Sequence, residues 1–173
     1  MSPIPLSPPR LIHALQTLLA LYTAQKSYIA ISNLQTYESA TEKAAKYSKT
    51  IENELWKTRK TQGMGGVMVV LSLVTSTLLF LDPHFLPRWA MYTTSPALLL
   101  AHVFARKYIA SYWAPSDGKN AGTRIPVPGM SEYNEASKAT EGLLQGLQWL
   151  EWSWLAAAAA GGVLGYGDVT LRG

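Results

Sequence analysis

Glu151 is the residue best placed to do chemistry in this sequence, because it is an acid within an otherwise apolar segment. Trp149, Trp152 and Trp154 lie close to it on either side. An acid at membrane depth is costly, so it suggests a structural ion pair, or a path for a proton or a ligand. The same residues also fit a membrane–water interface, where tryptophans form an aromatic belt. The sequence keeps all three interpretations open.

His102 is the second candidate, since a histidine inside an apolar helix can bind a haem, a metal or a quinone headgroup. Ligation of a metal or haem needs partner ligands. His13 is predicted at the opposite membrane face, and His84 lies in a predicted turn. The three histidines form no metal-binding motif. We therefore predict no cofactor and no metal site, and expect His102 to hydrogen-bond to a neighbouring helix.

Composition excludes several other classes of function. The chain has no cysteine, which rules out disulfides, thiolate metal sites and cysteine nucleophiles. No nucleophile elbow, phosphate loop or zinc-binding helix occurs. The net charge is +4, but Lys and Arg are spread over polar connections without interleaved stacking aromatics, so we predict no nucleic-acid binding. The most economical interpretation is a protein without catalytic activity of its own.

Three apolar segments would position these candidates. Residues 65–81 carry no charge and reach the length of a short spanning helix, and residues 89–105 form a second span that contains Pro96 and His102. We expect Pro96 to kink this helix rather than break it. A third span is predicted over 142–166. Its end is rich in small residues, including Gly161, Gly162 and Gly165, which would let another helix approach closely.

The remaining segments complete a single membrane domain over 1–173. Residues 11–34 either span the bilayer or lie along its surface, and 35–62 are predicted as a polar helix. Their shared periodicity allows one long helix over most of Pro9 to Lys60. Residues 108–130 are predicted as a polar loop, with a helix starting at Ser131. Lys and Arg concentrate in the two polar connections, which places these on the cytosolic or matrix side. The predicted fold class is all-α, an integral membrane bundle of three or four transmembrane helices with a long amphipathic N-terminal helix.

Two stretches carry a resemblance to a known family. They are the loop Arg124-Ile-Pro-Val-Pro-Gly-Met-Ser-Glu-Tyr-Asn134 and the helix Trp149-Leu-Glu-Trp-Ser-Trp154. Together with the hairpin of spans, they resemble small fungal accessory membrane subunits of respiratory complex I, of the NUXM type. The resemblance implies a subunit that stabilises the membrane arm of NADH:ubiquinone oxidoreductase in the mitochondrial inner membrane and carries no redox centre.

The leading hypothesis is thus a non-catalytic accessory subunit whose partners are other membrane subunits and membrane lipids. One alternative is a small membrane enzyme of fungal secondary metabolism, an oxygenase or terpenoid cyclase. It would use Glu151, His102 and Tyr92 or Tyr108 around an apolar cavity. Another alternative is a lipid-handling or chaperone subunit of the endoplasmic reticulum, which fits the same topology.

Overall fold

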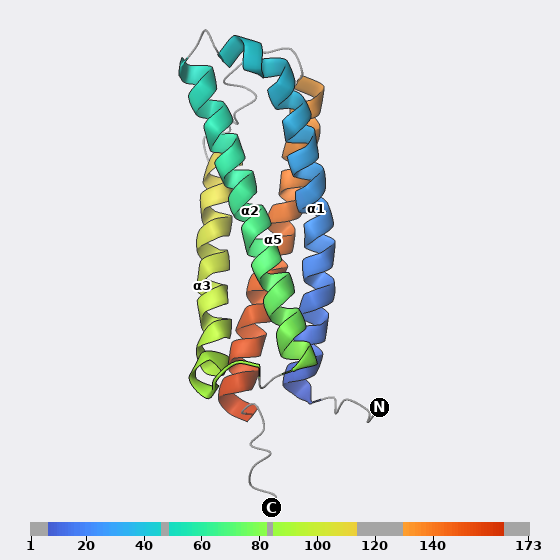
Figure 1. Cartoon of the computed structure of the whole chain (residues 1–173), viewed down its shortest axis with the longest axis vertical. Helices are drawn as coiled ribbons and strands as arrows, with labels where there is room; N and C mark the ends of the chain where they lie inside the picture. The colour runs from blue at the N-terminus through green and yellow to red at the C-terminus, as the bar shows by residue number, and fades with distance from the viewer. Residues whose placement is uncertain (1–6, 46–48, 83–84, 114–129, 165–173) are drawn as a thin grey trace, which may run out of the picture.

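The computed structural model describes residues 7–45, 49–82, 85–113 and 130–164, which form four α-helices and no strand. The helices are α1 (Pro8–Ala45), α2 (Lys49–Leu81), α3 (Arg88–Trp113) and α5 (Met130–Leu164). They run alternately up and down in an elongated bundle, and α1 packs most extensively against α5 and α2 (Figure 1). The all-α prediction is confirmed for the described residues.

Prolines set two of the helix starts. Pro8 and Pro9 occupy the first turn of α1, where a missing backbone N–H costs nothing, and Ser7 supplies the carbonyl that accepts from the Leu11 amide at 3.1 Å. Before α3, the carbonyl of Pro87 accepts from the amides of Ala90 and Met91. The two apolar segments thus lie in separate helices, and residues 83–84 of the predicted turn, with His84, lie outside the described residues.

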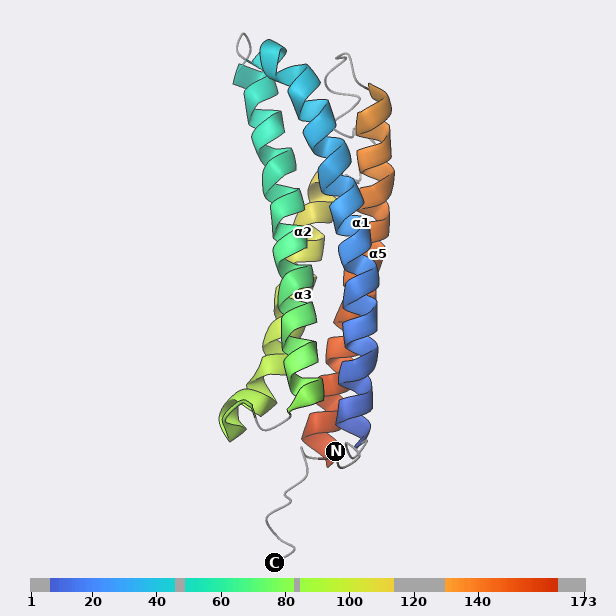
Figure 2. The same ribbon diagram turned by 45° about the vertical axis from the view of Figure 1, so that its right-hand side comes forward.

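Pro96 does not end α3, which continues to Trp113. Figure 2 shows the first turns of α3 leaning away from the other helices, whereas its later turns lie against them. A proline lacks the N–H that would bond to the preceding turn, so a bend at this point is its expected effect. The predicted kink agrees with this course of the helix.

Two predicted boundaries were wrong. No single helix covers most of Pro9 to Lys60, because α1 ends at Ala45 and α2 begins at Lys49 and runs antiparallel to α1 (Figure 1). The polar helix predicted over 35–62 is divided between these two helices. The physical reason is that a reversal lets both helices bury one face against each other, and Arg59 reaches Glu38 across the pair at 2.8 Å.

The predicted loop over 108–130 also begins too early, because α3 includes residues 108–113. Their aromatic side chains anchor this last turn and a half on α2. Trp113 is buried and donates its ring N–H to Thr61 at 2.9 Å, and the Tyr112 hydroxyl lies 3.1 Å from the Glu54 carboxylate. The rest of that loop, residues 114–129, lies outside the described residues.

Exposed apolar side chains surround one half of the bundle, the half that holds the start of α1, the end of α2, most of α3 and the end of α5. We call this surface the apolar belt. It consists of Leu11, Leu15, Leu18, Leu21 and Tyr22 of α1, Val67, Val70, Leu71 and Val74 of α2, Trp89, Leu100 and Phe104 of α3, and Trp149, Trp152, Leu155 and Val163 of α5.

By length and hydropathy, one helix in the described part of the chain can cross a membrane. It is Glu52–Leu81 of α2, with a mean hydropathy of 2.1 in its most apolar window. Only 33% of that window is buried, whereas the core helix of a soluble protein would be mostly buried. Within the described residues, the segments predicted as spans over 89–105 and 142–166, and the segment 11–34 with its spanning and interfacial alternatives, do not reach this length and hydropathy, and they stay predictions.

Candidate functional site

Behind the apolar belt, a column of polar side chains lies in the middle of the bundle among the apolar residues of the core. We call it the buried polar column. Its members are His13, Gln16 and Thr17 of α1, Ser72 and Ser76 of α2, His102 of α3, and Ser153 and Trp154 of α5. Each helix therefore contributes polar groups at one level, opposite the apolar residues that it turns outward.

Ser72 links three helices at the centre of the column. The Trp154 ring N–H donates to the Ser72 hydroxyl at 2.9 Å, and this hydroxyl lies 2.8 Å from Nε2 of His102. Nδ1 of His102 lies 2.8 Å from the Leu98 carbonyl, which can only accept. Nδ1 of His102 therefore carries a proton that it donates to the Leu98 carbonyl, and in the neutral ring Nε2 accepts from Ser72. The expected bond from His102 to a neighbouring helix is present.

The second half of the column joins α1 to α5 and α2. Nδ1 of His13 donates to the Gln16 side-chain oxygen at 2.6 Å, and the Gln16 amide donates to Ser153 at 3.3 Å. Thr17 and Ser76 bond at 3.0 Å. The His13 ring meets that of Trp154 at a centroid distance of 6.1 Å, and its Nε2 is buried without a hydrogen-bond partner. The two histidines thus contact the same tryptophan network from different helices.

Glu151 forms an ion pair with Arg106 of α3. Nε and Nη2 of Arg106 donate to Oε1 and Oε2 of Glu151, the second at 3.2 Å, which is a two-point contact. Glu151 is buried, with 8% of its surface exposed, whereas 28% of the Arg106 side chain is exposed. The carboxylate therefore has an intramolecular partner, which sequence spacing alone did not identify.

The three tryptophans near Glu151 do not form one group. Trp154 is fully buried in the column, whereas Trp149 and Trp152 point outward in the apolar belt. Trp149 stacks on Tyr22 of α1 with centroids 6.1 Å apart. This separation follows from the helical repeat, because positions 149 and 152 share a side of α5 that position 154 does not.

The glycines at the small-residue end of α5 also differ in burial. Gly161 is buried, and Gly162 is exposed with nothing within 4 Å of a Cβ placed on it. Gly165 lies outside the described residues. Of the two glycines that the structure describes here, Gly161 is thus the one that the bundle covers.

A close approach between α1 and α5 occurs at Gly146. A Cβ at Gly146 would lie 2.5 Å from Oγ1 and 3.0 Å from Cβ of Thr23, and a Cβ at Gly142 would lie 3.5 Å from the Lys26 stem. The sequence Gly142-Leu-Leu-Gln-Gly146 is a GxxxG pattern, in which two glycines on one face let helices approach closely. Sequence reasoning missed this contact, although the pattern itself gave the signal.

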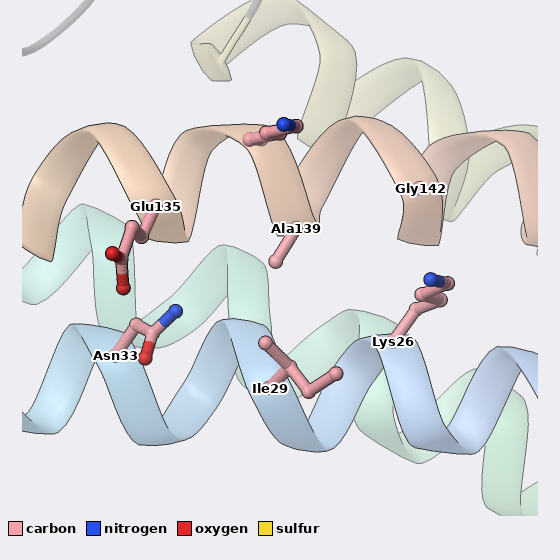
Figure 3. Close-up of a pocket in the computed structure, with 7 residues that line it drawn as sticks. Lys26, Ile29, Asn33, Glu135, Ala139 and Gly142 are labelled. Atoms are coloured by element: carbon pink, nitrogen blue, oxygen red, sulfur yellow. The ribbon is translucent and has the colours of Figure 1, made fainter.

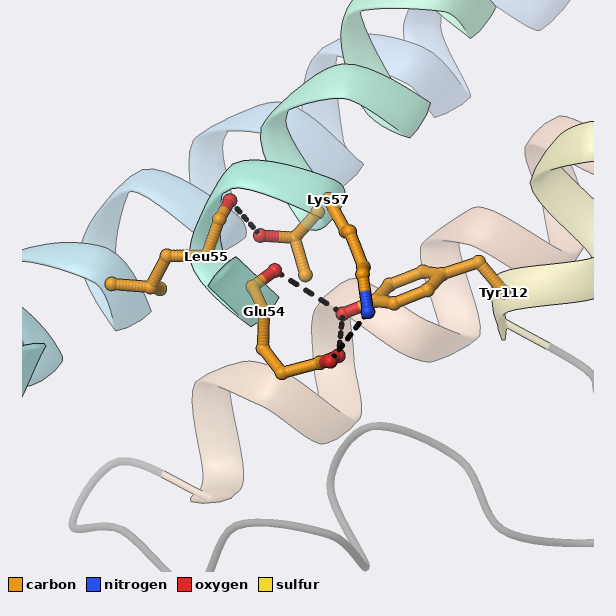
Figure 4. A network of polar contacts seen from close by, with 5 residues as sticks. Glu54, Leu55, Lys57 and Tyr112 are labelled. Atoms are coloured by element: carbon orange, nitrogen blue, oxygen red, sulfur yellow. Dashed lines mark hydrogen bonds and ion pairs between the residues drawn. The ribbon is translucent and has the colours of Figure 1, made fainter. Parts of the chain in front are cut away.

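A second polar layer lies in the other half of the bundle, which we call the charged half: α1 from Lys26 to its end, α2 up to Thr61, α3 from Arg106, and α5 up to Gly142. The Gln62 amide at its border donates to Thr140 at 2.6 Å. Figure 4 shows the Tyr112 hydroxyl and the Lys57 ammonium meeting at the Glu54 carboxylate, with a Lys57 distance of 2.8 Å. These contacts tie α2, α3 and α5 together.

The chemical capacity of these sites is limited. Both ring nitrogens of His102 and both carboxylate oxygens of Glu151 already have partners. Among the residues that the structure describes, no three His, Asp or Glu side chains gather as a metal site would need. The geometry is that of a hydrogen-bonded interior that holds helices in register. No family model, curated protein or solved structure matches the chain.

Proposed function

We propose that this chain is a non-catalytic integral membrane protein that stabilises or helps assemble a larger membrane complex as an accessory subunit. The observation that carries the proposal is that one half of the bundle exposes large apolar side chains while polar side chains are buried in its core. Leu15, Leu18 and Leu100 are exposed, each by more than 60%, whereas His13, Gln16 and Ser72 are almost fully buried.

A bilayer accounts for both parts of this arrangement. Soluble helices turn their apolar stripe inward, and soluble monomers rarely expose large continuous apolar surfaces. In hydrocarbon the outside of a helix can be as apolar as its core, and polar groups must find partners within the protein. Trp154, Ser72 and His102 satisfy one another in this way across three helices. The bilayer would lie around the apolar belt, with the charged half outside it.

The subunit role is supported by surfaces suited to protein contact. Ala156, Ala159 and Gly162 are exposed near the end of α5, where their small size permits another helix to pack closely. Lys57 and Arg59 are exposed on the charged half, where each forms an ion pair within the bundle and keeps an exposed side that soluble portions of a partner can contact.

The particular complex is part of the proposal. The resemblance to complex I accessory subunits favours the membrane arm of mitochondrial NADH:ubiquinone oxidoreductase, and thus the mitochondrial inner membrane. The endoplasmic reticulum is the other membrane compatible with the topology. The enzyme alternative lacks a gathered site: Tyr92 is exposed on α3, and Tyr108 lies beside Lys60 at 5.3 Å.

Two measurements test this proposal. Alkaline carbonate washing of membranes from cells that express the chain should leave it in the pellet, and release into the supernatant would contradict the membrane assignment. A tagged chain extracted in mild detergent should then run on native sizing as part of a large assembly. Complex I membrane-arm proteins should co-purify with it. A monodisperse monomer would contradict the subunit role while leaving the membrane assignment intact.

A further inference from the structure

A groove of about 350 Å³ lies between α1 and α5, next to the border between the apolar belt and the charged half. Figure 3 shows Lys26 and Gly142 at one end of the groove, Asn33 and Glu135 at the other, and Ile29 and Ala139 between them. This volume falls within the range of about 300–1,000 Å³ that small-molecule sites occupy.

The Lys26 end of the groove adjoins the apolar belt. The Lys26 ammonium lies 5.4 Å from the centre of the Tyr22 ring, and Tyr22 stacks on Trp149. Tyr and Trp concentrate where a membrane meets water. The absence of a side chain at Gly142 leaves room for the Lys26 stem against α5. A positive charge is therefore held at the edge of the apolar belt, beside an aromatic pair.

The opposite end offers acceptors for a positive group. Glu135 is exposed and Asn33 half-buried, and they face each other from α5 and α1 (Figure 3). Asn33 is seven residues beyond Lys26, which is about 10 Å along a helix. This end lies farther from the apolar belt, and the short apolar stretch at Ile29 and Ala139 separates it from Lys26.

We propose that this groove binds the headgroup of an aminophospholipid, with the phosphate at Lys26 and the primary ammonium at Glu135 and Asn33. The proposal rests on the membrane location argued above. It follows the order of a phospholipid, in which acyl chains, phosphate and ammonium succeed one another from hydrocarbon to water. The carboxylate of Glu135 and the amide oxygen of Asn33 can accept N–H donors, which a trimethylammonium group lacks.

Lys138 also lines the groove and is exposed. Its side chain can distinguish phosphoserine from phosphoethanolamine, the two headgroups that carry both a phosphate and a primary ammonium. Phosphoserine carries an additional carboxylate that Lys138 can bind, and phosphoethanolamine does not. The proposal concerns the phosphate and the primary ammonium that both headgroups carry. A contact between Lys138 and the lipid would identify phosphoserine as the headgroup that binds.

Native mass spectrometry of the purified full-length chain in detergent tests the proposal. The chain is titrated separately with phosphatidylethanolamine, phosphatidylserine, phosphatidylcholine and phosphatidylglycerol of identical acyl chains. We expect the first two to bind about tenfold more tightly than the last two, the effect of one charge-assisted hydrogen bond. Equal binding of all four lipids would overturn the proposal.

Substitutions assign the two ends of the groove. Glu135→Gln should weaken binding of both aminophospholipids about tenfold and leave phosphatidylglycerol unchanged, and Lys26→Gln should weaken all four lipids. The matched controls are Glu141→Gln and Lys107→Gln, which remove exposed charges of the same sign away from the groove lining. Aminophospholipid binding that persists in Glu135→Gln contradicts the assignment. In Lys138→Gln, selective loss of phosphatidylserine identifies phosphoserine, and no loss identifies phosphoethanolamine.

Two parallel measurements keep the possible failures separate. Circular dichroism of each variant in the same detergent checks that its helix content is that of the parent chain. Carbonate washing reports on the membrane location independently of any headgroup. A chain that stays in the membrane pellet but shows no headgroup preference overturns this inference alone, whereas a chain released by carbonate overturns the proposed function.

Discussion

The apolar half and the charged half of this bundle have similar interiors and different exteriors. Inside, Ser72 bonds to Trp154 in the apolar half, and Thr61 bonds to Trp113 at the same distance of 2.9 Å in the charged half. On the outside, the apolar half exposes Val74 and Leu100, whereas the charged half exposes Lys57 and Arg59. A hydrogen-bonded core is thus common to both halves, and what changes along the axis is the surface offered to the surroundings.

Burial of polar groups therefore does not by itself distinguish a half surrounded by water from a half surrounded by hydrocarbon. Polar side chains inside either half need partners, because an unpaired buried group is costly in any protein. The exposed residues are informative, because water favours polar side chains on the surface and hydrocarbon favours apolar ones. Matched substitutions in the two halves therefore test whether the two surfaces face different surroundings.

The largest expected effect is that of Arg106→Ala at the ion pair beside the polar column. This change leaves the buried Glu151 carboxylate without its partner, and we expect a loss of about 3–5 kcal/mol in the free energy of unfolding. Denaturant titration in mixed micelles, followed by tryptophan fluorescence, measures it. The double variant Arg106→Met with Glu151→Leu should recover most of the loss. An unchanged free energy of unfolding in Arg106→Ala would show that Glu151 is not buried in a low-dielectric environment.

A charge placed on the apolar belt should have the next largest effect. Val74→Arg puts a guanidinium on the exposed face of α2, and we expect membrane insertion to become less favourable by about 2.5–3.5 kcal/mol. The matched control is Asn53→Arg, exposed on the charged half of the same helix, which should change stability by less than about 0.5 kcal/mol. A glycosylation-based insertion assay compares the two. Equal tolerance of both changes would mean that water surrounds both halves.

Close packing of α1 on α5 predicts a smaller effect at Gly146. In Gly146→Ala the new methyl group would collide with Thr23, so we expect destabilisation by about 1–3 kcal/mol. Gly63→Ala on α2 is the control, because nothing lies within 4 Å of its added Cβ and alanine favours helix by up to about 1 kcal/mol. Thermal unfolding followed by circular dichroism should therefore give shifts of opposite sign. Shifts of the same sign would contradict the interface.

The smallest effect is expected at the ion pair of Lys57 and Glu54 in the charged half. The Lys57 side chain is 47% exposed, so water screens the pair, and Lys57→Ala should cost only about 0–1 kcal/mol. The same denaturant titration as for Arg106→Ala measures it, at low and high salt. A loss as large as that of Arg106→Ala would mean that the two ion pairs have similar surroundings.

Much of the helical architecture follows from local sequence. Residues 65–81 and 89–105 lie in helices because they form long apolar runs, and prolines separate them. The bond from His102 to a neighbouring helix was also predictable, since a buried imidazole needs partners. The division of the 35–62 helix was not, because its periodicity continues across Ala45 and Lys49 and only packing between α1 and α2 favours the reversal.

The residues of the candidate site could be predicted from the sequence, but the side chains that they contact could not. Glu151 and Trp154 stand out by type, yet their contacts, Arg106 and Ser72, lie far away in sequence. Nothing in the local pattern distinguishes Arg106 from the neighbouring Lys107, which is exposed. The contact of Gly146 with Thr23 had a sequence signal on α5 only.

The sequence by itself determined that the described chain is helical, apolar in long segments and without cysteine chemistry, because these properties depend on composition and on neighbours within one or two turns. The tertiary structure decided which face of each helix turns inward, and with it the partners of Glu151 and His102. The reason is that side-chain pairing between helices depends on their relative rotation and depth, which arise only when all four helices pack together.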